Sequence, residues 1–158
     1  MGRIEAKLGA LGLVLPPATD PPAANRTTCI QLGHVLWLSG HGARLPALPH
    51  VKTRGKVGSD VSEEEAYATA RATALTMLAT IARHTGDLDR VQRVLRLFGM
   101  VNVAPGFLRP SAVIDGASEL FFALWGPEQG RHVRTAIGVA ELTNGMVVEI
   151  QGEFELSP

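Results

Sequence analysis

The chain has 158 residues, of which 46% are hydrophobic and 19% charged, values typical of one globular domain. Its 15 Lys and Arg residues balance its 15 Asp and Glu residues, so no long-range field would gather nucleic acid or anionic lipid. A single cysteine excludes an internal disulfide and favours a reducing, cytoplasmic setting.

The predicted elements follow the order helix, strand, strand, helix, strand, helix, strand, strand. Helices are predicted where apolar residues recur every three or four positions, and strands where β-branched and aromatic residues cluster between turn residues. Along the chain these segments cover residues 3–11, 27–32, 34–39, 62–85, 91–103, 111–125, 134–142 and 146–151. No apolar run approaches the roughly 20 residues that span a bilayer, and no secretory signal is evident.

Local signals place the helix ends. Ser62 and Glu65 have the spacing of a capping box, and Gly86 suits the position after the helix. Ser111 is the predicted N-cap of the second long helix, which the Gly-Pro pair at 126–127 should stop.

Two irregular segments frame the first strands. Four prolines between residues 16 and 22 predict an extended connector, which divides the chain into an N-terminal helix with its connector, 1–24, and a main domain, 25–158. Residues 40–60 predict a long loop, and loops of that length are usually functional or cover something.

The C-terminal region offers the strongest candidate for a functional site. The Asn-Gly pair within 143–145 predicts a tight hairpin between the last two strands. Arg134 opens one strand and Glu149 lies within the other, so the pair could bind a small acid and hold a water beside it. The alternatives are a solvated arginine at a strand edge and a glutamate facing solvent.

A second candidate is the glycine-rich end of the second strand. Gly40 would allow a ligand to approach the backbone closely, although a plain turn is an equal alternative. His41 could act as a base, but the histidines show no metal-ligand spacing, so no metal site is expected. No phosphate-binding loop or dinucleotide-binding motif is present.

The chain resembles the Rid/YjgF family of reactive-intermediate deaminases, historically labelled endoribonuclease L-PSP, and is most similar to a longer YjgF-like subgroup with an added N-terminal helix. The segment from Arg134 to Glu149 is the most specific part of the likeness. The matching segments are 32–40, 55–60, 86–91, 104–107, 115–118 and 134–149.

The resemblance implies a chorismate-mutase-like α+β fold: a single domain whose mixed sheet is backed by two helices, plus the short N-terminal helix. It also implies a homotrimer with clefts between subunits and hydrolysis of enamine or imine intermediates to 2-oxo acids and ammonia. Carried over by position, Arg134 would bind the substrate carboxylate and Glu149 would hold the attacking water. The backbones of Gly40 and Ala136 would line the cleft.

Three positions depart from the family pattern. Arg26 stands nearest to a frequent cleft tyrosine, Asp115 replaces an asparagine, and His41 replaces a glutamine. All three are candidate substrate-binding residues. An ionised Asp115 would repel a carboxylate substrate unless Arg26 or Arg134 pairs with it.

An iminium carbon is already activated, so the expected deaminase needs no metal and no organic cofactor. The ligand would be a small imino or 2-oxo acid, with neither nucleic acid nor membrane as a partner. The alternative is a non-catalytic trimer that binds a small carboxylate. Ribonuclease activity is disfavoured by the neutral charge and by the lack of a basic stripe.

Overall fold

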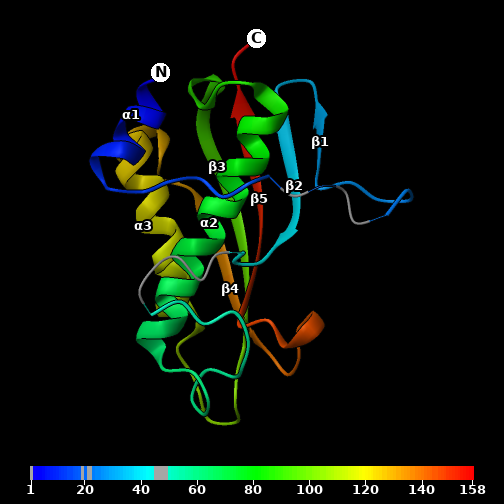
Figure 1. Ribbon diagram of the computed structural model, residues 1–158, viewed down its shortest axis with the longest axis vertical. Coiled ribbons are helices and arrows are strands. Elements are labelled where there is room, and N and C mark those ends of the chain that lie inside the picture. The colour runs from blue at the N-terminus through cyan, green and yellow to red at the C-terminus, as the bar shows by residue number, and fades with distance from the viewer. Residues whose placement is uncertain (1, 19, 21–22, 45–49) are drawn as a thin grey trace.

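The computed structural model describes residues 2–18, 20, 23–44 and 50–158. Two long helices lie side by side on one face of a sheet, and a short N-terminal helix lies beside them near one end (Figure 1). The elements are α1 Arg3–Ala10, β1 Cys29–Leu32, β2 Val35–His41, α2 Glu63–Thr85, η1 Leu88–Arg90, β3 Val91–Asn102, α3 Pro110–Gln129, β4 Val133–Val139, η2 Thr143–Gly145 and β5 Val148–Leu156. The predicted order of helices and strands is confirmed.

The sheet has five strands in the order β1-β2-β5-β3-β4, with β3 and β4 parallel and the other neighbours antiparallel. The predicted hairpin between the last two strands is therefore wrong, because β3 lies between β4 and β5. The Asn-Gly signal correctly marks a turn, since Asn144 and Gly145 both have positive φ. After this turn, however, the chain continues to the opposite side of β3 and forms β5 there, so β4 and β5 are not neighbours. β5 buries every second residue and takes the central position, whereas the more exposed β4 lies at the edge.

Capping chemistry sets the ends of α2 as predicted. The Ser62 hydroxyl accepts from the Glu65 amide at 3.1 Å, and the Glu65 carboxylate accepts from the Ser62 amide at 2.9 Å. Gly86 closes the helix in the left-handed conformation, at φ 75°.

The start of α3 differs from the prediction. Arg109 is the N-cap and Pro110 the first helical residue, a position that suits proline because the missing N–H would have no helical partner. Ser111 is thus inside the helix, and its hydroxyl is free for another role. The helix kinks at Gly126 (φ 80°) and continues for one further turn to Gln129, rather than stopping at the Gly-Pro pair.

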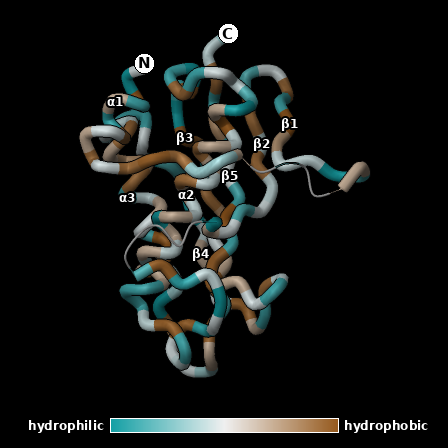
Figure 2. Tube along the Cα trace, viewed as in Figure 1, coloured by the Kyte–Doolittle hydropathy of each residue, from teal (hydrophilic) through white to brown (hydrophobic). Residues whose placement is uncertain are grey.

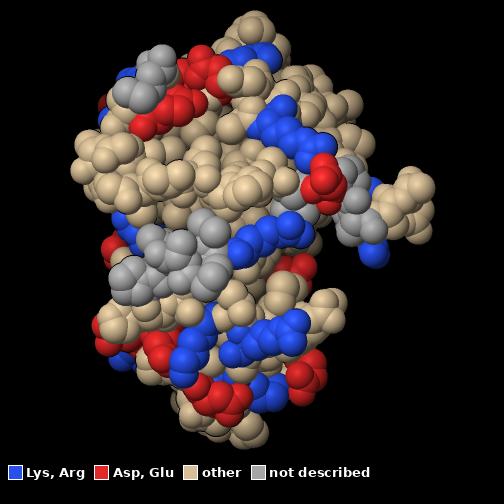
Figure 3. Space-filling view, viewed as in Figure 1, with Lys and Arg blue, Asp and Glu red and all other residues tan. Residues whose placement is uncertain are grey.

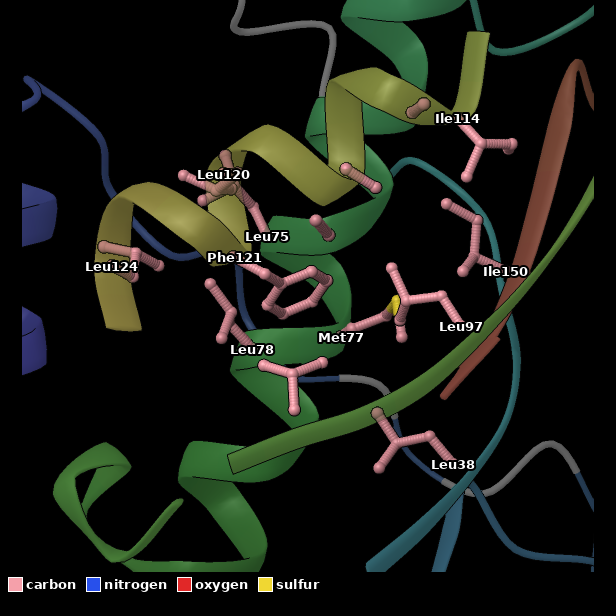
Figure 4. Packing of buried hydrophobic residues seen from close by; sticks show 14 of the residues in the cluster. Leu38, Leu75, Met77, Leu78, Leu97, Ile114, Leu120, Phe121, Leu124 and Ile150 are labelled. Atoms are coloured by element: carbon pink, nitrogen blue, oxygen red, sulfur yellow. The ribbon is translucent and has the colours of Figure 1, made fainter. Parts of the chain in front are cut away.

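The core lies between the two long helices and the sheet. Figure 4 shows apolar side chains of α2 and α3 pointing toward those of the strands. The labelled residues are Leu38, Leu75, Met77, Leu78, Leu97, Ile114, Leu120, Phe121, Leu124 and Ile150. The helices approach closely at Gly116, where an added Cβ would lie 2.1 Å from the Tyr67 carbonyl oxygen.

The N-terminal helix packs on the same core. Ile4 and Leu8 are buried, and the Asp89 carboxylate accepts from the Arg3 and Ile4 amides at 2.6 and 2.9 Å. The Lys7 ammonium donates to the Leu124 carbonyl at 2.6 Å. Within the described residues, no helix has the length and apolar character to cross a membrane.

The other face of the sheet, here called the outer face, is not covered by any helix among the described residues (Figure 1). Large apolar residues point out from it, including Ile30, Trp37 and Ile137, which are 63%, 49% and 38% exposed. Hydrophobic segments recur along the strands, as the brown stretches of β1, β2 and β3 show (Figure 2). Exposed apolar surface on a sheet face is typical of a surface that another protein covers.

Candidate functional site

Arg134 is held by one face of α3. It lies on β4 beside buried Leu97, so its side chain points to the helix side of the sheet. One terminal nitrogen, Nη1, donates to Asp115 Oδ1 at 2.6 Å and to Ser118 Oγ at 3.1 Å. The other, Nη2, donates to Ser111 Oγ at 2.6 Å. The three acceptors are four and three residues apart, a spacing that places them on one side of a helix.

This anchoring leaves part of the guanidinium available. An arginine carries five N–H donors, and these bonds use three of them. Within the described residues, the Nε–H and one Nη2–H have no acceptor. The side chain is only 20% exposed, unlike a freely solvated arginine. Arg134 is therefore an oriented cation with two donors left for a ligand.

A second layer of hydrogen bonds fixes Ser118. His132 Nδ1 donates to the Gly130 carbonyl at 2.8 Å, so the neutral ring accepts from the Ser118 hydroxyl at Nε2, 3.0 Å away. Burial lowers the pKa of His132, and the charge of Arg134 acts in the same direction. Ser118 donates to His132 and accepts from Arg134, which ties the position of the guanidinium to a neutral histidine.

An open pocket of about 330 Å³, here called the Arg134 pocket, lies over this cluster. It is lined by Asp115, Ser118, Glu119, Phe122, Gly130, Arg131, His132 and Arg134.

Glu149 lies elsewhere, on the outer face of the sheet. It pairs with Met100 of β3, and its neighbours Val148 and Ile150 are buried on the helix side. A bulge in β2 places Gly40 against it, and an added Cβ on Gly40 would lie 1.9 Å from Glu149 Oε1. A side chain at position 40 would displace the Glu149 carboxylate from the place it occupies here.

The Glu149 carboxylate makes no hydrogen bond or ion pair with any residue that the structure describes. Burial raises the pKa of this carboxyl group above its usual value. An unpaired, partly desolvated carboxylate is a good acceptor for a water molecule.

His41 is buried, with only 4% of its surface exposed. Its Nδ1 donates to the Ser39 carbonyl at 2.7 Å, and its Nε2 is 2.9 Å from the Thr80 hydroxyl. Burial lowers the pKa of the ring. Because both nitrogens are engaged, the side chain supports the wall of a second pocket and offers no nitrogen to a ligand.

The second pocket, here called the bulge pocket, has a volume of about 600 Å³ and includes Gly40 and His41. Ala136 is partly buried, packs against the core and pairs with Gly99. Arg26 is exposed in a turn before β1 and lines neither of the two pockets.

The structure thus forms two separate clusters from the predicted residues. Arg134 and Asp115 meet at the edge strand β4, and Gly40 and Glu149 meet at the bulge in β2. In one chain, Arg134 and Glu149 point to opposite faces of the sheet, with β3 between their strands.

Sequence reasoning missed the roles of three residues: Ser111, Ser118 and His132. The positions of Ser111, Asp115 and Ser118 at helical spacing were a usable signal, because they predict three polar groups on one side of a helix. His132 had no comparable signal, since its contact depends on the turn between α3 and β4.

Comparisons with known proteins agree with this architecture. A family model described as "YjgF/chorismate_mutase-like, putative endoribonuclease" matches residues 5–149. Protein TCP17 of Trypanosoma cruzi is 39% identical over 160 residues, covering 99% of this chain and 96% of that protein.

Two solved structures are similar over nearly their full length. Protein Atu1372 of Agrobacterium tumefaciens, of unknown function, is 35% identical with a TM-score of 0.87, covering 98% of this chain and 93% of that one. A "putative endoribonuclease" of Shewanella oneidensis is 28% identical with a TM-score of 0.89, covering 97% of this chain and 99% of that one. With its mixed five-stranded sheet and three helices, the chain belongs to the YjgF/chorismate mutase-like family and has that family's α+β fold.

Proposed function

We propose that this protein is a hydrolytic deaminase that converts reactive enamine or imine intermediates to 2-oxo acids and ammonia, acting as a homotrimer. The observation that carries the proposal is the oriented guanidinium of Arg134, with two N–H donors unused among the described residues. Family membership and the unpaired carboxylate of Glu149 support it.

Arg134 binds the substrate carboxylate. Its free Nε–H and Nη2–H donate charge-assisted hydrogen bonds, which are stronger than bonds between neutral groups. Ser111 and Ser118 hold the guanidinium in place, so little side-chain entropy is lost when the ligand arrives.

Glu149 positions the water. A lone pair of that water attacks the iminium carbon, the C–O bond forms, and the C=N electron pair moves to nitrogen. Glu149 accepts a proton from the water and returns it to the nitrogen of the carbinolamine. The C–N bond then breaks while the hydroxyl gives its proton to Glu149 and the carbonyl forms. The departing ammonia takes up that proton, so iminium plus water has become 2-oxo acid plus ammonium, the protonated form of ammonia.

Two copies of the chain are needed to complete this site. Two strand spacings, about 10 Å, separate β4 from β5, and the two side chains lie on opposite faces of the sheet. Packing the outer faces together would cover Ile30, Trp37 and Ile137. It would also let the Glu149 of one subunit approach the β4 edge of another.

The direct test is ammonia release from freshly generated 2-iminopropanoate. The wild type should accelerate release over the spontaneous rate, and Glu149→Gln should lose the acceleration while still binding pyruvate. Light scattering should report about three chains. A monodisperse monomer would contradict the shared site, and binding without acceleration would make the protein a non-catalytic carboxylate binder.

A mixing experiment isolates the shared site. Arg134→Ala and Glu149→Gln subunits should each be inactive alone. If each site takes one residue from each of two copies, equal mixing by co-refolding should restore about a quarter of the wild-type activity. No recovery in mixed trimers would mean that both residues must come from the same chain.

A further inference from the structure

The bulge pocket has the size of a small-molecule site and a wall in common with the Glu149 cluster. Its volume of about 600 Å³ lies within the range of ligand pockets. Most of its lining comes from three segments distant in sequence, the end of β2 with the residues after it, the loop before α2 and the turn before β5, and one residue each comes from the segment before β1 and from α2. The lining residues are Thr28, Ser39, Gly40, His41, Gly42, Ala43, Arg44, Thr53, Arg54, Thr76, Asn144 and Met146.

The charged residues that line the bulge pocket are all positive. Arg44 and Arg54 each add a positive charge, and no Asp or Glu is among the described lining residues. Figure 3 shows Lys and Arg side chains at the middle of the viewed face, near the level at which β2 ends in Figure 1, and further ones below, where Asp and Glu side chains lie among them. Two cations on one concave surface concentrate a positive potential, which attracts an anion.

These two arginines differ from most others in how they are bonded. Arg44 and Arg54 make no hydrogen bond or ion pair with any residue in the described part of the chain. Other arginines are within 4 Å of a carboxylate oxygen: Arg3, Arg83, Arg96, Arg109 and Arg134. Among the described residues, nothing pairs with the cations of the bulge pocket, which leaves them for an external anion.

Neutral donors lie beside them. Thr53 precedes Arg54, and Asn144 lies on the adjoining turn, where Arg54 bridges to Met146. The side chains of Thr53 and Asn144 make no hydrogen bond with the described residues. A hydroxyl and an amide next to a guanidinium are a donor set suited to a carboxylate or a phosphate.

We infer that the bulge pocket binds a second anionic group of the ligand, so that the protein acts on imino and 2-oxo acids with an additional carboxylate or phosphate. The inference rests on the proposed function for the position of the reacting carbon. Gly40 lies against Glu149 and is also one of the residues that line the bulge pocket, so the pocket and the Glu149 carboxylate are neighbours at the bulge in β2.

Calorimetric titration with stable 2-oxo acids tests this inference. Three ligands are compared. 2-Oxobutanoate has no second anionic group, 2-oxoglutarate has a second carboxylate, and 3-phosphohydroxypyruvate has a phosphate. The wild type should bind at least one of the last two about tenfold or more tightly than 2-oxobutanoate, the scale of one charged hydrogen bond. The double variant Arg44→Gln/Arg54→Gln should lose that preference.

The control is the double variant Arg71→Gln/Arg93→Gln. It also removes two positive charges, but from residues that line neither the Arg134 pocket nor the bulge pocket. It should keep the wild-type preference. Equal affinity for all three ligands, no measurable binding of 2-oxoglutarate or 3-phosphohydroxypyruvate, or a preference that survives in Arg44→Gln/Arg54→Gln would each overturn the inference. Because no turnover is measured, failure of imine hydrolysis would refute the proposed function and leave this result standing.

Discussion

Asp115 is the residue whose replacement most directly tests the role of Arg134. Its Oδ1 accepts from the guanidinium at 2.6 Å, and it stands where a substrate carboxylate would compete for the same cation. Asp115→Asn removes the negative charge but keeps a carbonyl oxygen that Nη1 can use. We expect this variant to bind pyruvate more tightly than the wild type.

The magnitude follows from the geometry. Two carboxylates that share one guanidinium stand roughly 5 Å apart, where their repulsion is about 1 kcal/mol in a water-like dielectric. The Asp115 side chain is 47% exposed and Arg134 is 20% exposed, so solvent screens the pair substantially. Relief of about 1 kcal/mol corresponds to a roughly fivefold lower Kd.

Calorimetric titration of pyruvate into the wild type and Asp115→Asn measures this change, and higher salt should reduce the difference. Glu119→Gln is the matched control. Glu119 lines the same pocket, but its carboxylate accepts from the Tyr67 hydroxyl and has no bond to Arg134. Its affinity should stay close to that of the wild type. A weaker or unchanged affinity in Asp115→Asn would mean that Asp115 orients the arginine and does not compete with the ligand.

Three further predictions concern stability. Gly116→Ala should lower the free energy of unfolding, measured in urea, by about 1–3 kcal/mol, because the new Cβ meets a backbone oxygen of α2. Gly9→Ala in α1 should raise the free energy of unfolding by about 0.5–1 kcal/mol, because the new Cβ has open space and alanine favours a helix more than glycine does. Ser62→Ala should lower it by about 1 kcal/mol in the same assay, since α2 loses its capping box. Glu149→Gln should raise the thermal midpoint at pH 7, because burial raises the pKa of the carboxyl and its ionised form therefore destabilises the fold. That gain should shrink as the pH falls through this pKa, where the wild type becomes neutral too; an equal gain at all pH values would contradict the electrostatic cause.

The helices could be predicted because their signals are local. Ser62 and Glu65 bond to each other's backbone across a single turn, so their spacing in the sequence is sufficient evidence. Ser111 shows the limit of this reasoning. Arg109 and Pro110 begin the helix instead, and the Ser111 hydroxyl accepts from an arginine 23 residues away.

Strand pairing was predicted less well because it is decided by the whole sheet. The Asn-Gly turn fixes positive φ at residues 144 and 145, but it does not choose the partner of the following strand. β5 pairs with both β2 and β3, and this central position buries the apolar side of Val148, Ile150 and Phe154. No short-range signal contains that information.

The misplaced hairpin changes the meaning of the two most specific residues. As facing hairpin partners, Arg134 and Glu149 would form one intrachain site. The crossing of β3 instead puts them on opposite faces of the sheet, each with its own supporting cluster. Ser111, Asp115 and Ser118 hold the arginine, and the close approach of Gly40 leaves room for the glutamate. Under the proposed function these clusters are the two walls of a site that closes only between copies. Gly40 connects the Glu149 cluster with the lining of the bulge pocket. Under the inference drawn from that pocket, one subunit would select the ligand's second charge while its neighbour holds the carboxylate.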